Sequence, residues 1–135
     1  MRTSFFASLA ALAASAVAAP LEVRETYATW SATEVQTLVA HIIYGVNFRI
    51  TAPAGYISGA PEFDVSCKVL AFSSPEVQPC TFNGPQADGS KVEAKFSYTG
   101  APVTVYHTFG STTASGGSGT LSYNTDFTVD VTSVV

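Results

Sequence analysis

Charged side chains, histidine and cysteine are all scarce in this chain of 135 residues, which holds six basic residues, ten acidic residues, two histidines and two cysteines. The few basic residues are scattered and form no positive run, so neither nucleic acid nor a membrane surface is an expected partner. His41 and His107 lie far apart, and neither has the His-x-His or Cys-x-x-Cys spacing of a metal site. We therefore expect no metal and no cofactor.

The sequence also lacks an apolar run of the roughly 20 residues that span a bilayer. Its longest apolar stretch, Phe5–Val17, follows a short basic start and leads to Ala18, which completes a small-x-small cleavage pattern. We expect residues 1–18 to be a signal peptide and residues 19–24 to be a pro-segment or a disordered N-terminus. Residues 25–135 are then a single β domain, secreted and extracellular.

What the sequence has in abundance is alternation of apolar and polar residues with a period of two. This pattern is typical of half-buried antiparallel strands. Clusters of glycine, proline, asparagine and aspartate separate the runs and predict turns. The sequence therefore predicts a mostly β protein, a small antiparallel β-barrel or sandwich, with strands in residues 41–51, 62–69, 91–98, 102–109 and the region after 119.

Three segments depart from simple alternation. Residues 31–39 have a capping-box spacing and an apolar stripe, which predict one short helix; a strand ending at Trp30, followed by an irregular turn, fits the same residues. Residues 110–119, rich in serine, threonine and glycine, are predicted to be a mobile loop. A final strand over 119–133 would be too long for this domain, so a bend near residues 124–126 is expected.

The two cysteines of a secreted chain most simply form one disulfide. A Cys67–Cys80 bridge would close a loop of about a dozen residues and stabilise the fold by roughly 3 kcal/mol in the chain-entropy model. Cys67 lies on the apolar side of its strand, so its sulfur is expected to point into the core. Two free thiols or an intermolecular pair are the alternatives.

Catalytic patterns are sparse, and the main prediction is that the chain is not an enzyme. No Gly-x-Ser-x-Gly motif occurs, and cysteines in a disulfide are no nucleophiles. One enzymatic hypothesis has His41, Glu62 and His107 as the proton-transfer set of a ribonuclease, because the stretch after His107 resembles the acid-histidine region of small secreted guanyl-specific ribonucleases. That chemistry also needs an arginine against the phosphate, for which Arg24 and Arg49 are the candidates. Otherwise both histidines are expected at the surface or at a strand edge.

Seven tyrosine and tryptophan side chains beyond residue 26 are many for so small a domain. Most are expected to fill the core or to cover its edges. Tyr56, in a loop flanked by glycine and proline, and Tyr106, on the polar side of its strand, are predicted as the exposed binding residues because tyrosine combines rigid contact area with a polar tip.

The mature chain resembles the Alternaria major-allergen-like family of small secreted fungal proteins. The residues that carry the resemblance are the junction Ala19–Arg24, Tyr27 with Trp30, the strand Gly45–Ile50, and Phe63–Cys67 with Cys80 downstream. The resemblance implies a compact β-barrel, an extracellular location and no enzymatic activity. It also implies a role as allergen, elicitor or effector, with a host defence protein or a small aromatic ligand as partner. The second disulfide of that family has no cysteines here, so we expect a monomer or a non-covalent oligomer.

Three functions are thus weighed from the sequence. The leading one is a non-enzymatic secreted protein that acts at a host or environmental interface as elicitor, effector or allergen-like binding module. The alternatives are the ribonuclease and a structural component of the cell wall or spore surface, which the surface rich in serine, threonine and glycine would also suit.

Overall fold

In the computed structural model, residues 25–135 are described, and they form one antiparallel sheet of nine strands without a helix. The predictions of a signal peptide and a pro-segment lie outside the described residues. The mostly β prediction is confirmed. The strands are β1 (Ala28–Ala40), β2 (Ile42–Ala52), β3 (Phe63–Leu70), β4 (Gln78–Pro79), β5 (Thr81–Phe82), β6 (Lys91–Phe96), β7 (Pro102–Phe109), β8 (Thr112–Thr120) and β9 (Phe127–Val134).

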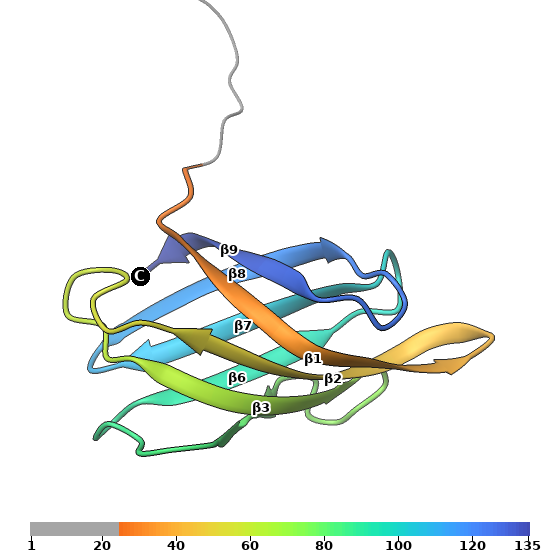
Figure 1. Cartoon of the computed structure of the whole chain (residues 1–135), viewed down its shortest axis with the longest axis horizontal. Helices are drawn as coiled ribbons and strands as arrows, with labels where there is room; N and C mark the ends of the chain where they lie inside the picture. Colours follow the sequence, from red (N-terminus) through yellow and green to blue (C-terminus); the bar gives the residue numbers. More distant parts are fainter. Residues whose placement is uncertain (1–24) are drawn as a thin grey trace, which may run out of the picture.

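The sheet curls until its two edges nearly meet (Figure 1). Its strand order is β4-β6-β7-β8-β9-β1-β2-β3-β5. The outermost strands, β4 and β5, belong to one short stretch, residues 78–82, which pairs with β6 through β4 and with β3 through β5. This stretch therefore forms the seam of a nearly closed barrel, and closure leaves few unpaired strand edges.

A disulfide and a side-chain amide reinforce the seam. Cys67 in β3 is bonded to Cys80, between β4 and β5, with a Cα–Cα distance of 4.5 Å. The Gln78 amide accepts a hydrogen bond from the Leu70 N–H (3.0 Å) and donates one to the Leu70 carbonyl (3.1 Å). The predicted intramolecular bridge is confirmed, and Cys67, only 2 % exposed, points into the core as expected.

The interior of the barrel follows the predicted period of two. In β7, Val103, Val105, His107 and Phe109 point inward and are buried, whereas the residues between them are half-buried. Trp30 and Phe96 are the largest apolar side chains that are fully buried. Alternation along β3, β6 and β7 thus contributes regularly spaced side chains to one continuous core.

The prediction of a helix at residues 31–39 is wrong, because these residues belong to β1. The strand also continues well past Trp30: β1 pairs with β9 as far as Ala32 and with β2 as far as Ala40. A bulge interrupts the β1–β2 register after Thr33, and Glu34 there has a φ of 54°. The capping-box spacing is a local preference, and pairing with two neighbouring strands outweighs it.

The loop predicted at residues 110–119 is also wrong, because Thr112–Thr120 is β8, between β7 and β9. Gly116 in this strand serves close packing, because a Cβ there would clash with the Asp130 carbonyl oxygen. Glycine in a strand often marks such a close approach of two backbones. The bend expected at residues 124–126 is confirmed, since the chain leaves β8 after Thr120 and re-enters the sheet at Phe127.

Antiparallel order divides the connections between two ends of the barrel. The distal end carries the β1–β2 hairpin tip and the connections 71–77, 97–101 and 121–126. The terminal end carries the connections 53–62 and 83–90, the β7–β8 turn, and both ends of the described chain. The β1–β2 hairpin projects furthest beyond the barrel (Figure 1). Within residues 25–135 no helix is long and apolar enough to cross a membrane.

Candidate functional site

The three residues of the ribonuclease hypothesis do not come together. His41 is exposed at the distal tip of the β1–β2 hairpin, with a φ of 69°. Glu62 precedes β3 at the terminal end, where Phe63 pairs with Ala52, the last residue of β2. The eleven residues of β2 therefore separate the two side chains, by about 36 Å at about 3.3 Å per residue. Two groups that flank one phosphate must both lie within hydrogen-bond reach of it.

His107 occupies the core rather than the surface, which corrects the expectation for this histidine, whereas His41 is exposed as expected. His107 is fully buried, and it joins two connections of the terminal end to β7. Its Nδ1 lies 2.6 Å from the Tyr56 hydroxyl and its Nε2 lies 2.9 Å from the Ser90 hydroxyl. Burial lowers the pKa of His107 to about 4 and raises the pKa of Tyr56. Ser90 is itself only 2 % exposed, so this serine–histidine contact offers no accessible nucleophile.

Tyr56 and Tyr106, the predicted binding residues, are both half-buried. The Tyr56 ring packs edge-on against Trp30, with ring centroids 5.4 Å apart, and its hydroxyl is bonded to His107. Tyr106 lies on the outer face of β7, beside Glu93 and Ser115 of the neighbouring strands. Their role in binding stays a prediction.

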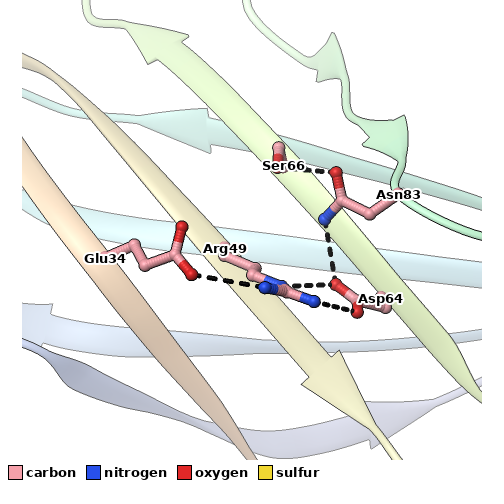
Figure 2. Close-up of polar contacts among 5 residues, drawn as sticks. All are labelled: Glu34, Arg49, Asp64, Ser66 and Asn83. Atoms are coloured by element: carbon pink, nitrogen blue, oxygen red, sulfur yellow. Dashed lines mark hydrogen bonds and ion pairs between the residues drawn. The ribbon is translucent and has the colours of Figure 1, made fainter.

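A polar cluster lies on the outer face of the barrel (Figure 2). Arg49 donates from Nε to one oxygen of Asp64 (2.8 Å) and from Nη2 to the other (2.5 Å), and its Nη1 contacts Glu34 at 3.3 Å. Asn83 donates to Asp64 and accepts from Ser66. The bulge in β1 brings the Glu34 carboxylate to Arg49, which shows how a bulge can redirect a side chain.

The single cation of this cluster faces two carboxylates. The Arg49 guanidinium lowers the pKa of Asp64 to about 2, and the two carboxylates raise the pKa of Arg49. The cluster borders a depression of about 430 Å³ over β2, β3 and the seam. Because Arg49 is already paired with two carboxylates, it is not a free cation that could hold a phosphate.

The largest exposed apolar side chains gather at the distal end. Five of the seven large hydrophobic residues that are most exposed lie there, and they come from four separate connections or strand ends: Val39, Ile42, Phe72, Tyr98 and Tyr123. We call these five residues the distal patch. The Phe72 and Tyr98 rings are stacked, with centroids 5.0 Å apart and planes tilted by 39°. The other two, Tyr27 and Val135, lie at the terminal end.

Sequence reasoning missed the distal patch for a physical reason. Tyr98 and Tyr123 share the apolar parity of their runs, so alternation predicts that both point inward. In the structure β6 ends at Phe96, and Tyr123 follows the end of β8, so neither residue is held to the inner face. The signal that could have placed them in turns is Thr99-Gly100 after Tyr98 and Asn124 after Tyr123.

The surroundings of the distal patch are polar but carry little charge. The connections 71–77, 97–101 and 121–126 contain two carboxylates, Glu76 and Asp126, and no lysine or arginine. The same connections carry exposed hydroxyl residues, at Ser74, Ser97, Thr99, Ser122 and Thr125. Within residues 25–135 no group of histidine, cysteine, aspartate or glutamate side chains is arranged to hold a metal ion.

Comparison with known proteins gives no match to a family model, to a curated protein or to a solved structure. The resemblance to the Alternaria major-allergen-like family stays a prediction.

Proposed function

We propose that this chain is a secreted, non-enzymatic binding protein that acts at a host or environmental interface through its distal patch. It would act there as an elicitor, effector or allergen-like module. The observation that carries the proposal is that large exposed apolar side chains from four connections lie at one end of a nearly closed barrel. Exposed apolar groups gathered in this way mark interaction sites more often than apolar groups that are scattered singly.

The rest of the molecule supports such a role. A closed barrel with a covalent seam holds connecting segments in fixed positions, and binding residues are commonly found on loops that a rigid scaffold supports. The disulfide is typical of proteins in oxidising compartments, which agrees with the predicted signal peptide. The separation of His41 from Glu62 and the pairing of Arg49 argue against the ribonuclease alternative. Arg24, the other candidate for its phosphate arginine, lies outside the described residues.

Infiltration of the purified protein into leaves tests the proposal. We expect cell death or defence-gene induction with the wild type, and no response with a triple variant, Phe72→Ala, Tyr98→Ala and Tyr123→Ala. Tyr27→Ala is the matched control, because Tyr27 is an exposed tyrosine at the opposite end, and it should act like the wild type.

Two results would contradict the proposal. A full response with the triple variant would place the contact elsewhere on the molecule, and no response with any form would remove the host-interface role. RNA cleavage that disappears in His107→Ala, with the fold retained, would restore the ribonuclease alternative.

A further inference from the structure

The three aromatic side chains of the distal patch are more exposed than its aliphatic ones. Phe72 is 68 % exposed, Tyr98 is 54 % exposed and Tyr123 is 66 % exposed. Phe72 and Tyr98 support each other through their stacking contact. Exposed rings at one end of the barrel, in connections that also carry exposed hydroxyl residues, suit a ligand that is apolar on one side and rich in hydroxyls at its edge.

The charges around the patch restrict what can bind. Glu76 and Asp126 would repel a polyanion, and the connections 71–77, 97–101 and 121–126 contain no lysine or arginine. The lysines nearest to them in the sequence, Lys68 and Lys95, belong to β3 and β6. An isologous contact between two copies would bring the same carboxylates towards each other. Both observations favour an uncharged ligand over an acidic polymer or a second copy of the chain.

We propose that the distal patch binds a neutral polysaccharide. The Phe72 and Tyr98 pair and the Tyr123 ring would stack on the C–H faces of pyranose rings, and the hydroxyls of Ser97 and Ser122 would meet the sugar hydroxyls. This inference rests on the proposed function and names the partner of the same surface. Binding of this kind would also hold the protein at a cell wall.

Co-sedimentation with insoluble polysaccharides tests the inference. The probes are cellulose, chitin and a β-1,3-glucan as neutral polymers, with crosslinked polygalacturonate as the anionic comparison. We expect the wild type to sediment with at least one neutral polymer and not with polygalacturonate. Phe72→Ala, Tyr98→Ala and Tyr123→Ala should each weaken binding by about tenfold, because one aromatic contact contributes roughly that factor.

Tyr27→Ala is again the matched control and should bind like the wild type. All four substitutions are at exposed positions. Thermal unfolding of each variant checks that the barrel is intact. Binding to a neutral polymer that no patch variant weakens would overturn the inference, and so would equal binding to polygalacturonate.

The leaf experiment separates failure of this inference from failure of the proposed function. If no neutral polymer retains the protein while the leaf response still requires the patch aromatics, the polysaccharide inference is wrong and the partner belongs to another chemical class. If neither polysaccharide binding nor a leaf response occurs, both proposals are wrong.

Discussion

At the scale of single residues, His107 links two connections of the terminal end through the two nitrogens of one ring. Tyr56 comes from the connection 53–62 and Ser90 from the connection 83–90. Within residues 25–135, the imidazole is hydrogen-bonded to these two hydroxyls, and the rings of Tyr56, Phe63 and Phe109 pack against it. Its partners on β6 and β8 are the apolar residues Val92 and Ala114, and no carboxylate among the described residues is paired with it. The core therefore holds a neutral imidazole.

This burial makes the fold sensitive to acid. The pKa of His107 is about 4 in the folded protein and 6.5 as the ordinary value, so the unfolded state binds more protons between these two values. The contribution of the neutral His107 to the free energy of unfolding is therefore fully present above pH 6.5 and falls as the pH is lowered towards 4. The loss should approach about 3 kcal/mol at pH 4, because each pH unit in that window is worth about 1.4 kcal/mol.

Urea unfolding at several pH values measures this loss. His107→Gln should be less stable at pH 7 but should lose most of the dependence between pH 4 and 6.5, and His41→Gln, at an exposed position, should keep it. Asp64 contributes little to the change in this window, because the stability linked to its carboxylate is lost mainly between its ordinary pKa of 3.8 and its folded pKa of about 2. An unchanged pH dependence in His107→Gln would refute the prediction.

Glu34 combines a favourable contact with an unfavourable backbone conformation. Its φ of 54° is in the left-handed region, where a residue with a Cβ costs about 1–2 kcal/mol relative to glycine. Its contact with Arg49 is exposed and contributes about 0–1 kcal/mol to the stability of the fold.

We therefore expect Glu34→Gly to be more stable than Glu34→Ala by about 1 kcal/mol. Both variants lose the contact with Arg49, and only the glycine relieves the backbone. Chemical denaturation of the two variants side by side measures the difference, and equal stability would show that the bulge is not strained.

At the scale of elements, Asn124 covers the edge of β1 beyond the point where β9 stops pairing. Its Oδ1 accepts from the Thr37 N–H (2.8 Å) and from the Thr37 hydroxyl (3.0 Å), and its own N–H donates to the Thr37 hydroxyl (3.2 Å). The Asn124 side chain thus satisfies the Thr37 N–H, a donor on the strand edge that β9 no longer pairs with.

Asn124→Gly should lower the unfolding free energy by about 1–2 kcal/mol and should increase aggregation on storage. Glycine suits the φ of 48° at this position, so the loss reports the hydrogen bonds and not the backbone. Ser122→Gly, in the same exposed connection, is the control. Unfolding curves and light scattering check both effects, and a variant as stable and soluble as the wild type would argue against this role.

Only some of these strands could be predicted from the sequence. Alternation located β2, β3, β6 and β7 because each of these strands buries one face in one core. It failed for residues 31–39, whose local pattern is that of a helix, and for residues 110–119, whose composition is that of a loop. In both segments the strand forms because it pairs with neighbouring strands on both sides. The candidate site was missed for a related reason: parity assigns Tyr98 and Tyr123 inward, and only the strand ends release them.

At the scale of the whole molecule, closure of the barrel depends on five residues, 78–82, and on the disulfide that anchors them. Replacing both Cys67 and Cys80 with alanine should lower the unfolding free energy by roughly 3 kcal/mol. That corresponds to a fall in melting temperature of about 10 °C for a domain of this size.

The protein should still fold, because strands β6 to β9 and β1 to β3 remain paired in one sheet. Calorimetry measures the melting temperature. Amide exchange should increase most, relative to the wild type, in the segment 78–82. An unchanged melting temperature would show that the bridge contributes nothing to closure.

Both ends of the described chain leave the barrel at the terminal end, opposite the distal patch. Tyr27 donates its N–H to Val131, and Val135 pairs with Thr113, so both ends are fastened to the sheet on that side. A carrier, bead or second domain joined through either terminus would therefore stand behind the barrel. Immobilised in this way, the molecule would present its exposed rings outward in one orientation, which suits it to use as a directional surface probe.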